Sequence, residues 1–470
     1  MSATLSKNIL FSHFLEVAKQ FPAKTALIDA VNNDSLTYQD LLKAVENKSA
    51  EYKNCEGKPV ILCEQNNINW VVDFLAIQLA GAVVVPVHVH LSEAEKTVIQ
   101  SNIPPSLTLP PSINGGGGDN NIDTAAIFHT SGTTGQPKGV MLSAENLLFD
   151  VKANCEILEL TPDDVLVTMS PFSHVYGLVN ILLSTLFTGA SLVIIPGFQP
   201  RKIIDAIEQH RVSVLIGVPT MYHSLLSVFE GHSQDISRDI SSLRVCHSGA
   251  APMSVALFHQ LENTFQVPVQ EGYGLSEATS IVTSNPLRGI RKPGSIGLPL
   301  KGIETQLDEN SQLLIKGPTV MQGYYSQDFT PHPTPLPQGE RGYSNAWLPT
   351  GDIVTQDADG YYYWQGRMDD VINVAGEKVY PKEVEEVLYQ HADVALCAVK
   401  AQACPVRFQR VSAFVVKKPA IATSDEDFIK QLMSLCRSQL ASYKVPYVIQ
   451  IVATIPTTPS GKIKRGELWL

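Results

Sequence analysis

A run of eleven residues from His129 to Gly139 carries the types of group that bind a polyphosphate. It reads His-Thr-Ser-Gly-Thr-Thr-Gly-Gln-Pro-Lys-Gly, so three glycines are interspersed with four side-chain hydroxyls and one lysine. Glycines let a loop turn tightly and bring backbone N–H groups close to an anion, and the hydroxyls and the lysine add further donors. The run therefore predicts a phosphate-binding loop. Its candidate ligands are Thr130, Ser131, Gly132, Thr133, Thr134 and Lys138.

This run is not a Walker P-loop, because that pattern requires Gly-Lys-Ser/Thr directly before a helix. Here Lys138 is followed by Gly139, and Pro137 has no backbone N–H to offer. The alternative interpretation is a surface turn rich in Gly, Ser and Thr. The length and order of the run favour the phosphate site.

A second motif, Gln-Glu-Gly-Tyr-Gly-Leu-Ser-Glu at residues 270–277, combines an aromatic ring with a carboxylate. The glycines on either side of Tyr273 leave its ring open to stack on a purine. Glu277 offers hard carboxylate oxygens, which suit a Mg²⁺ ion held between protein and phosphates. A solvated surface charge is the alternative for Glu277. The motif predicts a site for a nucleotide and its metal ion.

The phosphate run resembles the phosphate-binding loop of the adenylate-forming superfamily, which includes acyl-CoA synthetases, adenylation domains of peptide synthetases and luciferases. The resemblance spans most of residues 8–468, and it implies that the chain forms an acyl-adenylate from ATP and a carboxylic acid. It also implies that Glu277 is the magnesium ligand, with a further role in catalysis, and that Ser276 binds phosphate.

The nucleoside site follows from further matches to the same superfamily. The turn His247–Pro252 resembles its adenine loop, which implies that Gly249 and Ala250 lie against the base beside Tyr273; an ordinary tight turn is the alternative. Trp347–Ile353 resembles the motif whose aspartate, here Asp352, holds the ribose hydroxyls. Arg367 is the arginine that reaches the same sugar.

The segment Pro171–Gly177 resembles the border of the family's carboxylate pocket, which implies roles for His174 and Tyr176. A lone histidine is otherwise more often structural. The expected acyl pocket consists of His174, Tyr176, Gly249 and Gly274, with His174 also assigned to catalysis. Amino-acid-activating relatives place an aspartate near this segment, whereas no acidic residue occurs between Pro171 and Pro196. Because a buried, unpaired ammonium is costly, we expect an uncharged acyl tail.

The last hundred residues resemble the family's small domain, which is mobile and carries a catalytic lysine near its end. The match places this lysine at Lys462, in Pro-Ser-Gly-Lys-Ile-Lys-Arg, where a solvated basic tail is the alternative. It places the hinge at Asp369 and the thiol channel at Gly376. We therefore expect a large ATP- and acyl-binding domain over residues 1–368 and a small domain over 369–470.

The resemblance implies ATP, Mg²⁺ and a pantetheine thiol as partners in the reaction. The thiol belongs either to CoA or to the phosphopantetheine of an acyl or peptidyl carrier protein, and the acid is a fatty or an aryl acid. The first alternative is an amino-acid adenylation enzyme that loads a carrier protein. A nucleotide-binding protein without catalysis and a luciferase-type oxygenase are further alternatives.

The composition agrees with an enzyme of metabolism. The chain has 470 residues, 44% of them hydrophobic, and a net charge of −11, which argues against a nucleic-acid binder. Seven scattered cysteines and an N-terminus without a signal sequence predict a cytoplasmic protein. The apolar stretch Leu178–Ile195 contains polar residues and is interpreted as a buried helix and strand rather than a membrane span. The oligomeric state is not predicted.

The predicted elements that position these residues are strands and helices that alternate along the chain. Apolar positions at helical spacing predict a helix over 8–20, and Thr37 and Asp40 form a predicted capping box for the next helix. The alternation predicts an α/β fold with mainly parallel sheets and flanking helices, followed by a smaller α+β domain. The Pro- and Gly-rich segment 101–121 is predicted to be a link without regular structure, and the Pro-rich segment 330–342 a surface insertion.

Overall fold

The computed structural model describes residues 9–102, 124–130, 138–231, 239–325, 347–404, 408–418, 423–458 and 463–468. The phosphate-loop residues 131–134, Lys462, most of the 101–121 link and the whole 330–342 insertion lie outside this described part.

The helices are α2 (Ile9–Gln20), α3 (Tyr38–Tyr52), α4 (Ile68–Leu79), α5 (Glu93–Asn102), α6 (Ala144–Leu158), α7 (Ser184–Thr188), α8 (Pro200–His210), α9 (Pro219–Gly231), α10 (Val255–Phe265), α11 (Pro381–Tyr389) and α12 (Asp425–Gln439). Shorter helical segments are η1 (Gly177–Leu183), η2 (Ser276–Ala278), η4 (Met368–Asp370) and η5 (Arg465–Glu467).

The strands of the first 300 residues are β1 (Thr25–Asp29), β2 (Ser35–Thr37), β3 (Pro59–Leu62), β4 (Val83–Pro86), β5 (Thr124–Thr130), β6 (Lys138–Ser143), β7 (Val165–Val167), β8 (Ser191–Ile194), β9 (Val214–Gly217), β10 (Val245–Ser248), β11 (Val269–Tyr273), β12 (Thr283–Ser284) and β13 (Leu298–Pro299). The later strands are β14 (Glu304–Leu307), β15 (Gln312–Lys316), β16 (Gly323–Tyr325), β17 (Leu348–Gln356), β18 (Tyr362–Arg367), β19 (Ile372–Val374), β20 (Glu377–Val379), β21 (Val394–Cys404), β22 (Phe408–Lys417) and β23 (Val448–Ile451).

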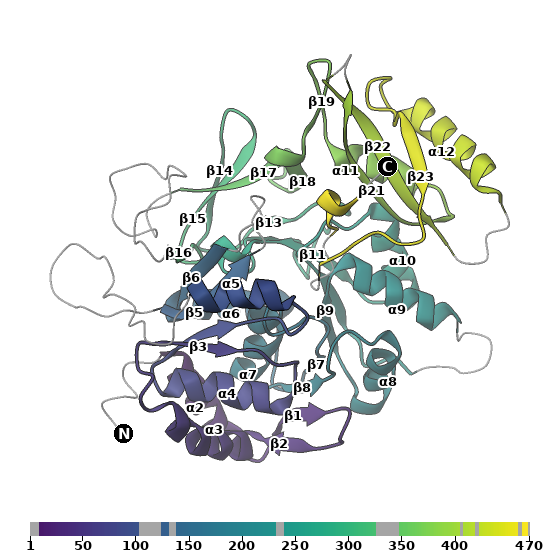
Figure 1. The fold of residues 1–470 in the computed structure, drawn as a ribbon. Helices are drawn as coiled ribbons and strands as arrows, with labels where there is room; N and C mark the ends of the chain where they lie inside the picture. Colours follow the sequence, from purple (N-terminus) through teal and green to yellow (C-terminus); the bar gives the residue numbers. More distant parts are fainter. Residues whose placement is uncertain are drawn as a thin grey trace.

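Two sheets form the body of the large part of the molecule (Figure 1). The nine-stranded sheet has the order β13-β12-β11-β10-β9-β7-β8-β1-β2, and the run from β11 to β1 is parallel throughout. The five-stranded sheet has the order β16-β6-β5-β4-β3, of which β3, β4 and β5 are parallel. This confirms the predicted α/β class. A third, four-stranded sheet, β14-β15-β17-β18, is antiparallel.

The C-terminal elements form a separate sheet, β20-β19-β22-β21 with β23 beside β22, which α11 and α12 accompany at the top of Figure 1. Buried apolar residues divide in the same way. One large cluster extends from Leu10 to Tyr362, and another from Ile372 to Ile449. The two clusters are separated between Tyr362 and Ile372, and the boundary between residues 368 and 369 stays a prediction.

Local predictions are confirmed where a cap or a turn residue defines the element. The Thr37–Asp40 capping box is present at the start of α3. Gly189 ends α7 with φ +82°, a conformation that glycine adopts easily. The apolar segment before it is helical, as predicted, and its first part, η1, is a π-helix; Ser184, the residue after η1, donates from Oγ to Val179 O at 2.8 Å.

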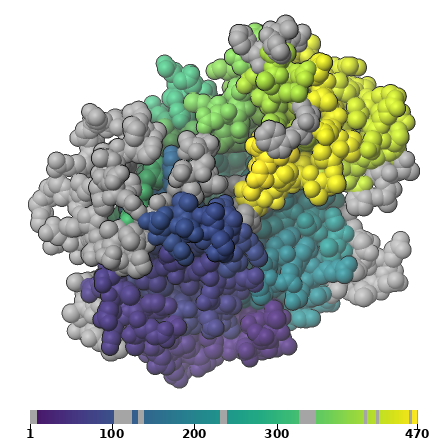
Figure 2. All heavy atoms as spheres, in the orientation of Figure 1, coloured from purple at the N-terminus to yellow at the C-terminus, as the bar shows by residue number. Residues whose placement is uncertain are grey.

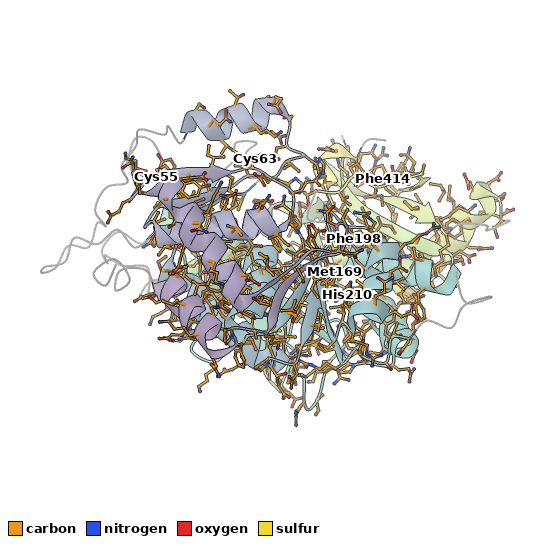
Figure 3. The ribbon with its side chains drawn as sticks, turned by 90° about the horizontal axis from the view of Figure 1, so that it is seen from below. Cys55, Cys63, Met169, Phe198, His210 and Phe414 are labelled. Carbon is orange, nitrogen blue, oxygen red and sulfur yellow. The ribbon has the colours of Figure 1, made fainter. Side chains whose placement is uncertain are left out.

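Side chains fill the space between the sheets and their helices (Figure 3). Met169, labelled there, is buried and packs against the end of β9; a Cβ at Gly217 would lie only 2.5 Å from its Cε atom. The seven cysteines are all free thiols. Within the described residues, no helix has the length and apolar character needed to cross a bilayer.

Candidate active site

The phosphate run joins the two strands of a hairpin. Strands β5 and β6 pair antiparallel with Thr130 opposite Lys138, so both ends of the predicted loop are held by backbone hydrogen bonds. The Nζ atom of Lys138 lies 5.2 Å from the centre of the Tyr324 ring. The Tyr324 hydroxyl donates a hydrogen bond to Glu277 Oε1 at 2.9 Å. Tyr324 thus links the lysine of the predicted phosphate loop to the predicted metal ligand.

Tyr324 was not predicted as a site residue. Nothing in the local pattern Gly323-Tyr324-Tyr325 shows which tyrosine meets Glu277. The pairing of β16 with β6 creates this contact, with Tyr324 opposite Val140.

The segment that carries Ser276 and Glu277 is fixed from behind by a buried carboxyl group. Asp150, on α6, accepts hydrogen bonds from the backbone N–H groups of Ser280 and Ile281, each at 2.8 Å. Thr319 Oγ1 lies 2.6 Å from Asp150 Oδ1 and 2.8 Å from the carbonyl oxygen of Ala278. Burial raises the pKa of Asp150 to about 7, although these hydrogen bonds act in the opposite direction.

The predicted adenine and ribose residues come together at the ends of β10, β11 and β18 and at the middle of β17. Tyr273 donates its hydroxyl hydrogen to Asp352 Oδ2 at 2.7 Å. Asp352, which is only 4% exposed, lies opposite Arg367 in the β17–β18 pair, and Arg367 Nη1 is 3.8 Å from Asp352 Oδ2. Trp364, which was not predicted, donates to Asp352 Oδ1 at 2.9 Å. The carboxylate is thereby oriented beside the tyrosine ring.

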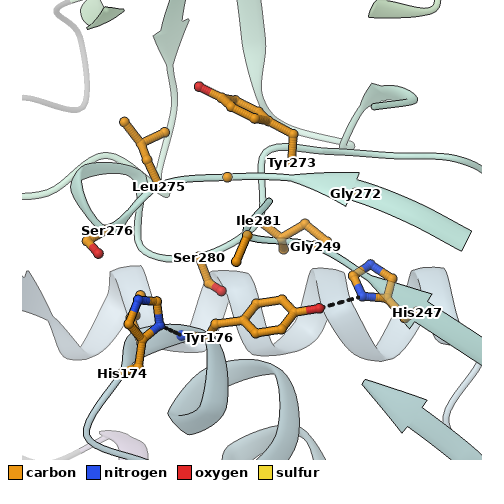
Figure 4. A pocket seen from close by; sticks show the side chains of 13 residues that line it. His174, Tyr176, His247, Gly249, Gly272, Tyr273, Leu275, Ser276, Ser280 and Ile281 are labelled. Atoms are coloured by element: carbon orange, nitrogen blue, oxygen red, sulfur yellow. Dashed lines mark hydrogen bonds between the residues drawn. The ribbon is translucent and has the colours of Figure 1, made fainter. Parts of the chain in front are cut away.

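The predicted acyl-pocket residues line a single pocket, shown in Figure 4. His174, Tyr176, Gly249 and Gly274 are among its walls, together with Tyr273 and Ser276. The pocket is narrow, with about 20 Å³ of free space. No acidic side chain occurs among the described residues that line it, in agreement with an uncharged acyl group.

The polar groups of this pocket form a chain. His174 Nδ1 accepts a hydrogen bond from the Tyr176 backbone N–H at 3.2 Å. The Tyr176 hydroxyl lies 3.1 Å from Gly217 O and 3.1 Å from Nδ1 of His247. His247 is fully buried, and burial lowers its pKa to about 4. Its place in the pocket was not predicted, because the turn 247–252 was interpreted only through its small residues.

A larger cavity of about 480 Å³ lies between the large and small parts of the chain. Its large-domain wall includes the nucleoside residues Ala250, Tyr273, Gly274, Asp352 and Arg367. Its small-domain wall includes Lys382, Glu386, Ile463 and Arg465.

Lys462 lies outside the described residues and directly precedes Ile463, which lines this cavity. Around Ile463, a bridge joins Thr457 to Ile463 and the Lys464 N–H donates to Pro456 O at 2.9 Å. Arg465 holds the segment to α11 through Glu385, at 2.6 Å. Figure 2 shows the yellow C-terminal segment against the dark-blue α5 region of the large domain.

The two other predicted small-domain residues lie elsewhere. Gly376 follows β19 and is absent from the residues described as lining either pocket; a Cβ there would meet no atom within 4 Å. In Figure 1, β19 is at the top of the molecule, away from β11. Asp369 is exposed in η4. This structure thus presents the terminal segment, and not the loop of Gly376, to the nucleotide residues.

Fold and site together define an adenylate-forming enzyme. The model of the family described as AMP-binding enzyme matches residues 14–112 and 118–325, and that of the AMP-binding enzyme C-terminal domain matches residues 383–462. The chain therefore belongs to the AMP-binding enzyme family, and within it to the acyl-CoA synthetase type.

Several characterised proteins are similar to this chain. It is 29% identical to oxalate–CoA ligase of Arabidopsis thaliana over 96% of both chains. It is 34% identical to long-chain-fatty-acid–CoA ligase of Bacillus subtilis over 74% of this chain, a match that spans 61% of that relative's length. The crystal structure of an anthranilate CoA ligase with anthranoyl-AMP aligns with a TM-score of 0.85 at 25% identity, over 97% of this chain and 96% of that one.

Proposed function

We propose that the chain is an ATP-dependent acid–thiol ligase that converts a carboxylic acid to an acyl-adenylate, with release of pyrophosphate, and then transfers the acyl group to the thiol of CoA. The family and the named CoA ligases among its relatives support this activity. The observation that carries the proposal is the meeting of three groups at one place: the nucleoside residues, an acyl pocket without acidic residues, and the terminal segment next to Lys462.

The first half-reaction must bring two anions together. Two unit charges 4 Å apart repel by about 4 kcal/mol at an effective dielectric constant of 20, and a triphosphate carries more than one charge. The residues present suit this task. Thr130, Lys138 and Ser276, with the loop residues 131–134, would hold the phosphates, and Lys462 would lie between the carboxylate and the α-phosphate.

Glu277 fits a magnesium ion, because it offers carboxylate oxygens within reach of the Lys138 end of the phosphate hairpin. When bound, Mg²⁺ would neutralise part of the charge on the leaving pyrophosphate. Tyr324 orients the carboxylate for this purpose. Tyr273, Gly249 and Ala250 would hold adenine, and Asp352 and Arg367 the ribose.

The second half-reaction requires Lys462 to leave and a thiol to enter. We assign the pivot to Asp369, between a large domain of residues 1–368 and a small domain of residues 369–470, and the thiol channel to the loop of Gly376. A turn of the small domain about a few backbone torsions would exchange the two loops at the cavity. The acceptor is CoA or, as the alternative, the phosphopantetheine of a carrier protein. The free cysteines support a cytoplasmic location.

The test is ATP–pyrophosphate exchange with purified protein across a panel of fatty, aryl and amino acids, followed by thioester formation with CoA or a carrier protein. Lys462→Ala should lower exchange by at least 100-fold. Lys464→Ala is the matched control, because Lys464 is two residues away and paired with Glu467 at 2.8 Å. Undiminished exchange in Lys462→Ala, or exchange with amino acids alone, would contradict the proposal.

A further inference from the structure

The inner end of the acyl pocket contains a nitrogen atom without a partner. The side chain of His247 is fully buried, and within the described residues its Nε2 has no hydrogen-bond partner. Its other nitrogen, Nδ1, is 3.1 Å from the Tyr176 hydroxyl, the contact dashed in Figure 4. A buried polar atom without a partner costs free energy, so such an atom in a pocket wall calls for a ligand.

The hydrogen bonds of Tyr176 determine whether a ligand of His247 Nε2 must be a hydrogen-bond donor or an acceptor. Its oxygen is 3.1 Å from the carbonyl oxygen of Gly217, which can only accept. If the hydroxyl hydrogen pointed at His247 instead, two oxygen atoms would face each other with lone pairs at that distance. The hydrogen therefore goes to Gly217, and the Tyr176 oxygen accepts from Nδ1–H of His247.

This arrangement fixes the tautomer of His247. Burial lowers the pKa of the imidazole to about 4, so the ring is neutral near pH 7 and carries one proton. With that proton on Nδ1, Nε2 presents a lone pair. It is an acceptor that needs a hydrogen-bond donor.

Two glycines lie beside this acceptor and its partner ring. A Cβ at Gly272 would lie 2.9 Å from His247 Nε2, and a Cβ at Gly249 would lie 3.0 Å from the Tyr176 ring. Both glycines line the same pocket as His247. The free space of about 20 Å³ is that of one or two water molecules, which also suits a hydroxyl group at the end of an acyl chain.

We propose that His247 is a specificity-determining residue that accepts a hydrogen bond from a hydroxyl group on the acyl substrate, so that the enzyme prefers carboxylic acids with a hydroxyl remote from the carboxylate. The inference rests on the proposed ligase function. An acid that ends in an alkyl group or an unsubstituted ring leaves Nε2 unpaired. An acid with a second carboxylate would place oxygen lone pairs against the lone pair of His247 Nε2. Both are disfavoured, by about 10- to 100-fold in kcat/KM relative to a hydroxylated acid.

The experiment compares acids in pairs that differ by one hydroxyl: 4-hydroxycinnamate with cinnamate, 4-hydroxybenzoate with benzoate, and 3-hydroxybutyrate with butyrate. The readout is the ratio of kcat/KM values in pyrophosphate exchange within one preparation, which does not depend on the active fraction. In the wild type, at least one pair should favour the hydroxylated acid 10-fold or more. In His247→Phe, which keeps a planar ring without the acceptor, that ratio should fall to within about twofold of one.

Tyr222→Phe is the matched control. The Tyr222 hydroxyl lies 2.7 Å from the backbone oxygen of His247 and 2.9 Å from that of Leu215, and its one hydrogen can go to either, so the variant loses a buried hydrogen bond next to His247 without changing the His247 ring. Its substrate ratio should match that of the wild type. A ¹⁵N spectrum of the histidine side chains at pH 7 should show the His247 resonance, identified by its loss in His247→Phe, in the neutral Nδ1–H form.

The possible results distinguish a failure of the proposed role of His247 from a failure of the proposed ligase function. If acids support exchange but no pair favours its hydroxylated member, or if the ratio survives in His247→Phe, the inference is wrong and the ligase function stands. An Nε2–H tautomer would also overturn it. If no carboxylic acid supports exchange at all, the proposed function fails and the inference fails with it.

Discussion

Asp150 shows how one buried carboxyl group can hold a site that it does not touch. It is fully buried and contacts the segment on which Glu277 and the pocket residues Ser280 and Ile281 lie. Thr319 has one hydroxyl hydrogen but two acceptors within reach, Asp150 and Ala278 O. Protonated Asp150 resolves this conflict, because it donates to Thr319, which then donates to Ala278.

Replacement of Asp150 should therefore distinguish the protonated from the ionised group. In Asp150→Asn, the amide can donate to Thr319 and accept from both backbone N–H groups, so we expect a folded protein with stability near that of the wild type. Asp150→Ala leaves those N–H groups unpaired and should lose about 2–4 kcal/mol. Urea unfolding monitored by fluorescence measures both. A large loss in Asp150→Asn would show that the group is ionised.

The same residue predicts a pH dependence of stability. Burial raises the pKa of Asp150 from 3.8 to about 7, so between these values the unfolded chain releases a proton that the folded chain keeps. The stabilisation is complete below about pH 4 and is lost as the pH rises through 7. Asp150→Asn should flatten the fall in unfolding free energy between pH 5 and pH 8. Glu271, whose burial raises its pKa to about 7 in the same way, should keep part of the slope.

Glu277 should control the magnesium requirement of the first half-reaction. Glu277→Gln keeps an oxygen that can accept from Tyr324 but removes the negative charge that a Mg²⁺ ion needs, so half-maximal exchange should require at least 10-fold more Mg²⁺. A titration of pyrophosphate exchange against MgCl₂ measures this. Glu304→Gln, at the outer strand β14 and paired with Lys316, should leave the titration unchanged. An unchanged requirement in Glu277→Gln would remove this residue as the metal ligand.

At the scale of elements, short sequence motifs predicted those site residues whose roles follow from their neighbours in the chain. Tyr273, Asp352 and Arg367 were predicted by motifs and lie together, the first and last at strand ends and Asp352 within β17. Asp150, Tyr324 and His247 were missed, because each acquires its role from a residue far along the chain: Ile281, Glu277 and Tyr176. Helix and strand positions followed from apolar periodicity and caps, whereas the pairing of β6 with β16, whose paired residues are 182 to 186 positions apart, has no local signal.

Helix α11 is the element that docks the small domain in this arrangement. The Glu386 carboxyl group lies near the backbone N–H of Val255, at the N-terminus of α10, where a negative charge is favourable, although burial raises its pKa. Lys382, one turn earlier, lies 3.5 Å from Gly294 O and near the buried carboxyl group of Glu271. These contacts cross from the small to the large domain, so they stabilise the arrangement that presents the terminal segment.

Loss of the charges of Lys382 and Glu386 should slow only the formation of the acyl-adenylate, because that half-reaction needs the terminal segment at the nucleotide residues. We expect Lys382→Met with Glu386→Gln to lower pyrophosphate exchange about 10-fold and to leave thioester formation from added acyl-adenylate and CoA within about threefold of the wild type. Glu383→Gln is the control on the same helix, since Glu383 pairs with Lys444 inside the small domain. An equal loss in both half-reactions would indicate general destabilisation instead.

At the scale of the whole molecule, two independently packed cores meet at a cavity that neither could form alone. Asp369 is exposed in the short helical turn η4, between β18 and β19. Asp369→Pro should restrict the torsions there, so thioester formation should slow at least 10-fold while pyrophosphate exchange stays within about threefold.

Stopped-flow or quench measurement of the two half-reactions, each with its own substrates, would show this split. Asp369→Ala keeps the backbone torsions free and should slow thioester formation much less. Equal rates of adenylation and thioester formation in Asp369→Pro would place the pivot elsewhere.

The neighbouring parallel strands β9, β10 and β11 end side by side at Gly217, Ser248 and Tyr273, and the acyl pocket opens at these ends. The residues proposed to recognise the acid therefore lie on other elements than the phosphate hairpin of β5 and β6. We expect that a substitution at position 247 can change which acids are accepted while the residues of that hairpin stay the same. Such modularity lets descendants of one ancestor adopt new metabolites quickly, and it gives the protein engineer a small set of positions to randomise first.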